Sequence, residues 1–382
     1  MKIFLSFLQS EIQHPIPAYS FWQYYIKKGI AEAGHTWDEA PGLDWAFGIV
    51  PKSIEEQNSW KGKVWEQTVN YLEENPADVF LSYLYPAQID SGAINRIKSL
   101  GIACVNFFCD NVREFKKIPA EFSVFDLNWV PEQKAIDLYK SAGYNYINLP
   151  MPIWLEPKLR VPQGEANSLL TFIGSKDIQR QLFFENVMLK RPDLPLAIHG
   201  KGWGEGAAEP VLAARHYSLG NKLAFQFNFI KENGTLPYLR KLKQRKLSAE
   251  ISPVLKAKVG GPISFEEYNQ LTSASMITVG VNRYPSYNFP LNQPNTYSRL
   301  RDIEAPMLGA CYLTEYTEGL GDLYDFDNEI AVYTDASSFI AKVDVLQKDK
   351  KLRKKLKVNG QKRALHDHSI AQSLNKIIQK IR

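Results

Sequence analysis

The sequence predicts an α/β protein with two domains, each built on a doubly wound parallel sheet. Short apolar segments alternate with amphipathic helical segments along both halves of the chain, which is typical of parallel strands joined by helices. A proline-rich stretch at 151–167 interrupts this alternation, and a new apolar segment follows it. With 382 residues, of which 45% are hydrophobic, the chain is long enough to form two separate cores.

The first domain is expected at 1–150 and should be Rossmann-like. Strands are predicted at 2–7, 78–81, 102–108, 127–130 and 146–149, and helices near 21–33, 64–74, 91–100 and 133–142. Gly34, Gly101 and Gly143 each follow a helix, at the position where a glycine commonly ends one. The parallel strands should share one carboxyl edge, and open α/β sheets bind ligands at that edge.

The second domain, also Rossmann-like, is expected at 168–365, after the linker at 151–167. Its strands are predicted at 168–173, 196–199, 276–281 and 310–313, and its helices near 180–190, 265–274 and 301–308. A segment at about 204–260 has no place in this alternation, so we interpret it as a basic insertion that is expected to be helical. The last helix, within 366–382, is expected to return to the first domain.

A charged pair lies at the start of the helix predicted at 301–308. Arg301 and Glu304 share one helix face because they are three residues apart. Gly309 can end the helix, and residues 310–313 suit a buried strand. A carboxylate at the carboxyl edge of a parallel sheet can accept hydrogen bonds from ribose hydroxyls. Glu304 is therefore a candidate nucleotide-binding residue, whereas Arg301 could face phosphates or pair with an acidic neighbour.

Two glycine-containing loops follow the first two strands of the second domain. Gly174 and Ser175 follow the strand at 168–173, and Arg180 lies just beyond them. Glycine lets backbone N–H groups approach a pyrophosphate, although an ordinary strand-to-helix turn has the same pattern. The second loop contains the run His199, Gly200, Lys201, Gly202 and Trp203. Its glycine spacing is not that of a dinucleotide fingerprint, so no NAD site is predicted.

These motifs, taken in order, resemble the C-terminal half of GT-B glycosyltransferases. In particular, they resemble the group 1 transferases and the related spore-maturation-protein type. The shared pattern is Arg-x-x-Glu-Ala, a glycine, a short strand, a Glu-Ile pair and a closing His-rich turn, here 366–369. The resemblance implies a GT-B fold and transfer of a sugar from a nucleotide-sugar, with UDP as the expected nucleotide, to a hydroxyl acceptor. It also implies that the second domain binds the donor and the first domain binds the acceptor.

The resemblance assigns the donor to loops at the carboxyl edge of the second sheet. The nucleotide base is expected near the His199 loop and near the backbone of the loop that contains Ile263. The donor-binding candidates are Gly174, Ser175, Arg180, His199, Gly200, Trp203, Ile263, Asn282, Tyr284, Arg301 and Glu304. Thr296 stands where the larger group 1 pattern has a further glutamate, so the role of that glutamate is not transferred to this chain.

Two polar residues of the first domain are catalytic candidates. His14 follows the first strand, and Asp110 follows the strand at 102–108. A sugar hydroxyl is a weak nucleophile, so a neighbouring His or Asp could act as general base. Turn formation or helix capping would account for either residue equally well. No Asp-x-Asp pair or His/Cys cluster lies in a predicted donor site, so we expect activity without a metal or other cofactor.

Charge is distributed unevenly along the chain. The net charge is +5, but residues 231–258 carry eight Lys or Arg against two Glu, which is a local charge of +6. The basic residues are interleaved with aromatic residues and leucines. This segment could bind an anionic acceptor such as DNA or a lipid-linked glycan, or it could be a solvated or dimer-forming arm. The candidate acceptor-binding residues are Arg240, Lys241, Lys243, Arg245 and Lys246.

The three cysteines and the absence of a long apolar run predict a soluble, cytoplasmic protein. Cys104, Cys109 and Cys311 are widely separated and lack a metal-ligand spacing, which favours reduced thiols. Peripheral contact with a membrane remains an alternative.

The expected activity is that of a hexosyl- or pentosyltransferase. Three alternatives remain: a phage-type enzyme that glycosylates modified DNA bases, a UDP-sugar epimerase of the same fold, and a non-catalytic polymer-binding protein.

Overall fold

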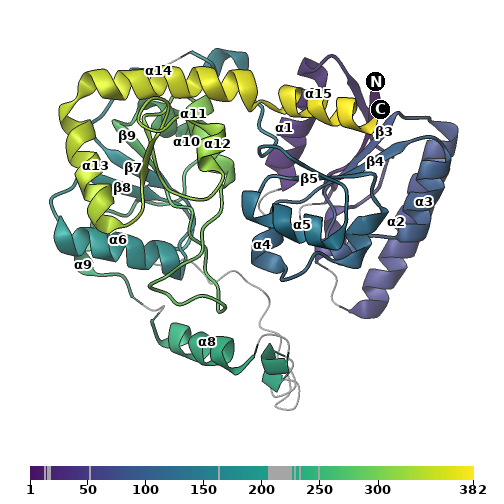
Figure 1. Cartoon of the computed structure of the whole chain (residues 1–382), viewed down its shortest axis with the longest axis horizontal. Coiled ribbons are helices and arrows are strands. Elements are labelled where there is room, and N and C mark those ends of the chain that lie inside the picture. The colour runs from purple at the N-terminus through teal and green to yellow at the C-terminus, as the bar shows by residue number, and fades with distance from the viewer. Residues whose placement is uncertain are drawn as a thin grey trace. The chain divides into compact units, whose positions relative to one another are not determined.

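The chain forms two compact units (Figure 1). The computed structural model describes residues 1–12, 14, 19–50, 53–161, 164–204, 226–227, 229–231, 234–247 and 250–382. The first unit comprises Met1–Pro157, Ser298–Glu304 and Arg363–Arg382, and the second comprises Lys158–Tyr297 and Ala305–Lys362. Two of the boundaries fall inside helices, namely α11 (Leu300–Met307) and α14 (Lys350–Asp367).

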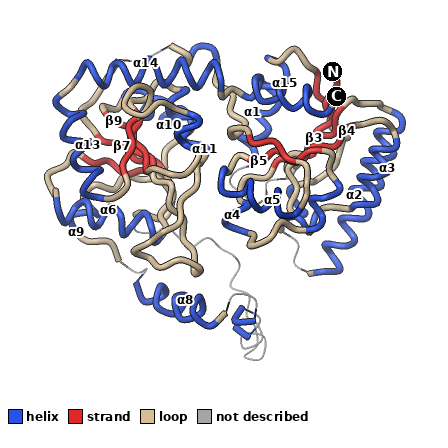
Figure 2. Tube along the Cα trace, in the orientation of Figure 1, coloured by secondary structure: helices blue, strands red, loops and turns tan. Residues whose placement is uncertain are grey.

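The strands of the first unit, red in Figure 2, lie at its centre. They form a six-stranded parallel sheet in the order β2-β1-β3-β4-β5-β6. Its strands are β1 (Lys2–Ser6), β2 (Thr36–Asp38), β3 (Val79–Ser82), β4 (Ala103–Phe107), β5 (Leu127–Val130) and β6 (Tyr146–Asn148). Its helices are α1 (Tyr19–Glu32), α2 (Ile54–Glu74), α3 (Ser91–Ser99), α4 (Asn111–Glu114), α5 (Ile136–Ala142) and α15 (Ile370–Ile381). The strand order reverses between β1 and β3, so the loops at their carboxyl ends are natural positions for a ligand.

The second unit has a five-stranded parallel sheet in the order β11-β10-β9-β7-β8. Its strands are β7 (Leu170–Ile173), β8 (Leu196–His199), β9 (Ile277–Gly280), β10 (Tyr312–Glu315) and β11 (Ala331–Tyr333). Its other helices are α6 (Ile178–Lys190), α8 (Thr235–Leu247), α9 (Pro253–Lys256), α10 (Phe265–Ala274), α12 (Leu320–Leu323) and α13 (Ala336–Lys348). The order reverses between β7 and β9, which makes their carboxyl ends the corresponding ligand position.

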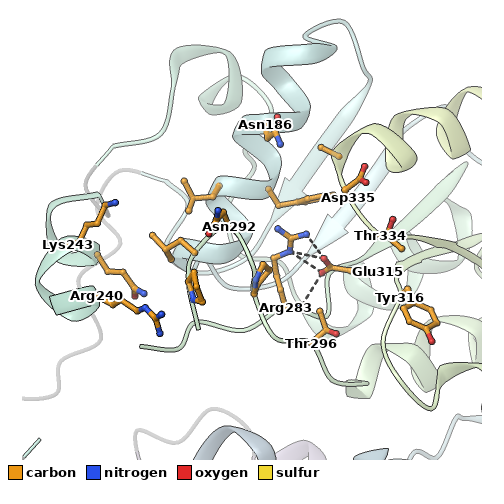
Figure 3. A pocket seen from close by; sticks show the side chains of 17 residues that line it. Asn186, Arg240, Lys243, Arg283, Asn292, Thr296, Glu315, Tyr316, Thr334 and Asp335 are labelled. Carbon is orange, nitrogen blue, oxygen red and sulfur yellow. Dashed lines mark hydrogen bonds and ion pairs between the residues drawn. The ribbon is translucent and has the colours of Figure 1, made fainter. Parts of the chain in front are cut away.

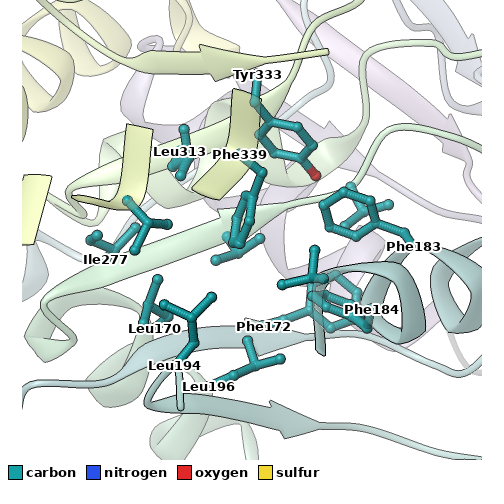
Figure 4. Close-up of a cluster of buried hydrophobic side chains, with 14 of the residues drawn as sticks. Leu170, Phe172, Phe183, Phe184, Leu194, Leu196, Ile277, Leu313, Tyr333 and Phe339 are labelled. Carbon is teal, nitrogen blue, oxygen red and sulfur yellow. The ribbon is translucent and has the colours of Figure 1, made fainter. Parts of the chain in front are cut away.

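The core of the second unit lies between its sheet and the helices α6 and α13 (Figure 4). Several aromatic rings pack together within it. Phe183 stacks on Tyr333 with centroids 5.2 Å apart, and Phe339 meets both rings edge-on. This packing fixes α6 against the last strand and so positions the loops at the carboxyl edge.

The fold class expected from the sequence is confirmed, with local differences. Helix α2 begins ten residues earlier than the predicted 64, where Ser53 caps it by accepting a hydrogen bond from the Glu56 N–H at 3.1 Å. The sequence missed β2, because this edge strand has only three residues and one of them is an exposed tryptophan. Strand β10 lies two residues later than the predicted 310–313.

Helical structure occurs in the described part of the insertion at 204–260. Helices α8 and α9 account for 235–247 and 253–256, and α9 contacts α6. Leu255 of α9 is fully buried in the core of the second unit. Residues 205–225 of the predicted insertion lie outside the described residues.

Candidate functional site

The loops after β7 and β8 cross closely at the carboxyl edge of the second sheet. The Gly174 N–H donates to the His199 carbonyl at 2.7 Å, and the Lys176 N–H donates to the Lys201 carbonyl at 2.8 Å. Gly200 has a φ of +136°, and a Cβ at this position would overlap the backbone of Gly174. Only glycine fits there, because backbone cannot move aside as a flexible side chain can. The fold therefore brings together the two glycine loops predicted from the sequence.

Trp203 supports these loops from the core side. Its ring is buried and lies near those of Phe172 and Phe184. Its indole N–H donates to the Gly174 carbonyl oxygen at 2.7 Å. A buried ring held in this way positions the Gly174 loop and presents no face to a nucleotide base, which differs from the base contact expected for Trp203.

Ser175 and Arg180 occupy the turn between β7 and α6. Asp177 caps α6 by accepting from the Arg180 N–H at 2.9 Å. The Arg180 guanidinium donates to the Ser175 carbonyl at 2.7 Å and lies over the Phe172 ring. Arg180 thus holds the shape of the turn, while the Ser175 residue is exposed on its surface.

A third loop passes beside the end of β8. The Gly260 N–H donates to the Ile198 carbonyl of this strand at 2.7 Å. A Cβ on Gly260 would overlap the His199 imidazole. Among the described residues, no partner is available to the buried Nδ1 of His199. Ile263 lies in the same loop, and a capping box of Ser264 and Glu267 then begins α10. His199 is therefore a polar group at the carboxyl edge that a ligand could satisfy.

Asn282 and Tyr284 follow β9 and are both buried. The Asn282 side-chain amide donates to the Glu315 carbonyl at 2.8 Å, and the Tyr284 hydroxyl accepts from the Asn295 amide at 2.8 Å. These bonds fix the loop after β9. The two side chains therefore shape this part of the edge from within, which differs from the direct phosphate or sugar contact expected from the sequence.

Arg283 and the buried Glu315 form an ion pair at the same edge (Figure 3). The Arg283 Nε lies 2.9 Å from one carboxylate oxygen, and the backbone N–H groups of Asn282 and Arg283 donate to the other at 3.2 and 3.1 Å. The guanidinium carbon lies 4.8 Å from the centroid of the Phe183 ring. The sequence prediction missed Glu315 because it ended the preceding strand at 313, although a carboxylate two residues after an apolar run was an available signal.

This ion pair lines a cavity of about 890 Å³ that lies wholly within the second unit. Further lining residues come from α6, from the loop after β9, from the ends of β10 and β11, and from α8. They are Leu182, Phe183, Asn186, Pro290, Leu291, Asn292, Pro294, Thr296, Tyr316, Thr334, Asp335, Ala336, Arg240, Lys243 and Gln244. The predicted donor residues Gly174, His199 and Ile263 do not line this cavity.

The five basic residues predicted to bind the acceptor have different surroundings on α8. Arg240 and Lys243 line the cavity. Lys241 lies instead over the Phe229 ring, with its Nζ 4.1 Å from the ring centroid. Arg245 and Lys246 belong to the helix, but their side chains lie outside what the structure describes. The sequence could not distinguish the surroundings of these five residues, because all of them are basic residues in the same short stretch.

Glu304 lies in the middle of α11, not at its start, and is buried. Its carboxylate accepts a hydrogen bond from the Tyr25 hydroxyl of α1, a neighbour that the sequence does not reveal. Arg301 is half-buried on the same helix. The start of α11 is held by the buried Asp302, which accepts from the Arg299 N–H at 3.1 Å.

In the first unit, His14 forms a hydrogen-bonded pair with Asp44. The His14 Nε2 lies 2.7 Å from one carboxylate oxygen of Asp44, and the other oxygen accepts from the Phe47 N–H at 2.9 Å. A carboxylate that orients an imidazole favours proton transfer at the other ring nitrogen. Asp44 was missed because it lies 30 residues from His14 in the sequence.

Asp110 lies at the start of α4, beside the fully buried Glu132. One oxygen of Glu132 accepts from the Asn111 N–H at 2.7 Å. Burial raises the pKa of Glu132 to about 8, and the nearby negative charge of Asp110 acts in the same direction. The Glu132 carboxyl is therefore mostly protonated at pH 7, so it supports the Asp110 turn as a neutral group.

In the described part of the chain, no group of three or more His, Cys, Asp or Glu side chains is arranged to hold a metal ion. Every helix described is too short or too polar to cross a lipid bilayer.

Several known proteins share this architecture. Sucrose-phosphate synthase from Thermosynechococcus elongatus superimposes with a TM-score of 0.62 at 13% identity, covering 100% of this chain and 98% of that one. A glycosyltransferase from Rickettsia africae superimposes with a TM-score of 0.58 at 12% identity, covering 100% of this chain and 97% of that one. Anabaena HepE, solved with UDP-glucose, gives 0.56 at 10% identity, covering 99% of both chains.

Sequence comparisons identify the family. The search of curated proteins finds no match to the chain. The model of the glycosyl transferase-like family matches residues 179–379, which is more than half of the 382 residues. The matched region includes the His199 loop, the Arg283–Glu315 pair and the helix that carries Arg301 and Glu304. The chain therefore belongs to the glycosyl transferase-like family, and its two parallel sheets have the GT-B fold.

Proposed function

We propose that this glycosyltransferase moves a sugar from a UDP-sugar to a hydroxyl acceptor. The observation that carries the proposal is the close crossing of Gly174 and Gly200 at the carboxyl edge of the second sheet, in a chain of this family. Such a crossing keeps the exposed turn at Ser175 free of interfering side chains, so a diphosphate can approach the backbone of that turn. UDP is the proposed nucleotide because HepE was solved with UDP-glucose on a similar fold.

We assign roles in donor binding to six of the predicted residues. The Gly174–Ser175 turn, shaped by Arg180, binds the diphosphate. His199 and the backbone near Ile263 bind the base, with the His199 Nδ1 as a hydrogen-bonding group. Glu304 binds the ribose hydroxyls with the carboxylate that also accepts a hydrogen bond from Tyr25.

Transfer breaks the bond between the anomeric carbon and the donor phosphate oxygen, and forms a bond from that carbon to the acceptor oxygen. The nucleoside diphosphate leaves, and the acceptor hydroxyl loses its proton to a base. We assign this base to His14, because Asp44 holds its ring in place. Asp110 is the second candidate, at the carboxyl end of β4.

Several finer assignments complete the proposal. The enzyme is a hexosyl- or pentosyltransferase of the spore-maturation type and needs no metal or other cofactor, because helix N-termini and basic groups stabilise the leaving diphosphate. Its location is cytoplasmic with peripheral membrane contact. The exposed leucines of α8, at 236, 239 and 242, support that contact because they lie on a basic helix. A homodimer stays a prediction.

Turnover of a donor panel tests the proposal. Release of UDP from UDP-sugars should rise on addition of a suitable hydroxyl acceptor and should persist in excess EDTA. An epimerase would convert the donor without releasing UDP, and a non-catalytic binder would leave it intact. Loss of turnover in EDTA, restored by manganese, would contradict the proposed metal independence but not the transfer reaction.

A further inference from the structure

Helix α8 packs against its own unit with polar side chains. The Arg240 guanidinium donates to the Asn288 carbonyl at 2.6 Å, and the Gln244 amide donates to the Ser286 carbonyl at 3.2 Å. Gln244 is buried. Arg240 and Gln244 lie four residues apart, so they share one face of the helix, and that face contacts the loop after β9. The inner face of α8 is therefore polar.

The leucines of α8 are the exposed side chains. At about 3.6 residues per turn, Leu239 and Leu242 are rotated by about 140° and 160° from the buried Gln244. Leu236, Leu239 and Leu242 have exposed fractions of 56%, 59% and 39%. Figure 1 shows α8 apart from the sheet of its unit and from α6 and α9. A polar inner face with exposed leucines reverses the usual pattern of a surface helix, which indicates that the leucines have a partner of their own.

A further exposed apolar side chain, Phe227, belongs to the segment beside α8. The Tyr238 hydroxyl donates to the Gln226 side chain at 2.9 Å, which ties this segment to the helix. Phe227 is 69% exposed. Residues 231–258 carry eight Lys or Arg against two Glu, and Lys231 and Lys243 are exposed. Exposed apolar side chains among cations match a surface that has acyl chains beneath a layer of negative charge.

We propose that α8 docks the enzyme on a membrane that contains anionic phospholipids. The three leucines and Phe227 enter the boundary between the headgroups and the acyl chains, and the exposed lysines contact lipid phosphates. The proposal rests on the proposed function in one respect, since it names the lipid for the peripheral contact given there. The acceptor stays assigned to the first unit, so the cations of α8 serve the membrane and not the reaction.

A second copy of the chain suits this surface less well. In a symmetric dimer the same patch meets itself, so the cations of α8 would face like charges. Three leucines and one phenylalanine also expose less area than the roughly 800 Å² that each partner buries in a typical stable interface.

Flotation of the full chain with lipid vesicles tests the proposal. Binding to phosphatidylcholine vesicles that contain phosphatidylglycerol should be at least about tenfold tighter than binding to phosphatidylcholine alone, and should weaken as salt is raised. Leu239→Ser should weaken this binding by about tenfold, because it removes an apolar side chain that docking buries. Leu189→Ser is the matched control, since Leu189 is 84% exposed on α6 of the same unit. It should leave binding within about twofold of the wild type.

A polarity-sensitive dye reports insertion directly. Cys104, Cys109 and Cys311 are buried, so a cysteine introduced on the surface can be labelled selectively. The emission of a dye attached to the Leu239→Cys variant should shift to shorter wavelength when anionic vesicles are added, because its surroundings become apolar. The same dye on the Leu189→Cys variant should show no shift, and equal emission changes in the two variants would contradict insertion of α8.

Four outcomes of the binding experiments would overturn the proposal. Equal binding to vesicles with and without phosphatidylglycerol would remove the role of the cations. Equal losses in the Leu189 and Leu239 serine variants would remove the role of the leucines. Self-association that Leu239→Ser abolishes would make a second copy the partner, and tighter binding of duplex DNA than of vesicles would make the partner a nucleic acid.

Failure of the proposed function is distinguishable from failure of docking. In the first case no UDP-sugar would turn over, while the protein would still float with anionic vesicles. In the second case the protein would not bind vesicles, while turnover of UDP-sugars with a water-soluble acceptor would persist.

Discussion

Glu304 is the single carboxylate on which nucleotide binding is proposed to depend. Glu304→Gln should weaken UDP binding by about 1–3 kcal/mol, because hydrogen bonds from the ribose would then reach a neutral amide. Tyr25→Phe is the control, since it removes one hydrogen bond to the same carboxylate and leaves the charge in place. Calorimetry should give near wild-type UDP affinity for Tyr25→Phe. Unchanged affinity in Glu304→Gln would reduce Glu304 to a partner of Tyr25.

Glu132 makes the free energy of unfolding depend on pH. Its pKa is about 8 in the folded protein, against an ordinary value of 4.5, so the folded state binds the proton more tightly. Its contribution to stability is therefore fully present below pH 4.5 and is lost as the pH rises to about 8. Glu132→Gln keeps a neutral acceptor for the Asn111 N–H. The free energy of unfolding, measured with urea, should fall between pH 5 and pH 8.5 in the wild type. In Glu132→Gln this fall should be smaller by on the order of 3 kcal/mol. The same pH dependence of the unfolding free energy in the variant and the wild type would contradict the raised pKa of Glu132.

At the scale of an element, the geometry of the β7 and β8 loops depends on glycine at position 200. Gly200→Ala should lower the free energy of unfolding by at least about 2 kcal/mol, because it combines a positive φ with overlap against the Gly174 backbone. Gly204→Ala is the control, since an added Cβ meets nothing within 4 Å there. UDP affinity and thermal stability should both fall in the first variant and stay unchanged in the second. Equal behaviour of the two would mean that the loop crossing is not needed for the donor site.

At the scale of the whole molecule, the chain returns to its first unit at the end. Helix α15 contacts α1, and a Cβ on Gly29 would overlap the Ile370 side chain. Gly29→Ala should therefore destabilise the protein by about 1–3 kcal/mol by displacing α15. Gly62→Ala, in an open part of α2, should instead stabilise it by about 0.5–1 kcal/mol, since alanine favours a helix. Thermal unfolding distinguishes the two, and stabilisation by Gly29→Ala would contradict the close packing of α15.

The sequence by itself determined the fold class, most strand and helix positions, and the presence of glycine-containing loops after β7 and β8. It could do so because alternating apolar segments and glycine positions are local patterns, and local backbone preferences set both of them. The capping box of Ser264 and Glu267 was predictable for the same reason, since its two residues lie three apart in one helical turn. The error at β10 was also local: the apolar run from 310 contains no signal for the strand's exact start.

Only the tertiary structure decided which side chains meet. The partners of Glu304, His14 and Arg283 are Tyr25, Asp44 and Glu315, which lie 279, 30 and 32 residues away in the sequence. It also separated Lys243, which lines the cavity, from Lys241, which lies over an aromatic ring. Pairing between distant residues depends on how strands are ordered in a sheet and how helices pack on it. Those arrangements follow from burial of the whole apolar surface, and no short stretch of sequence encodes them.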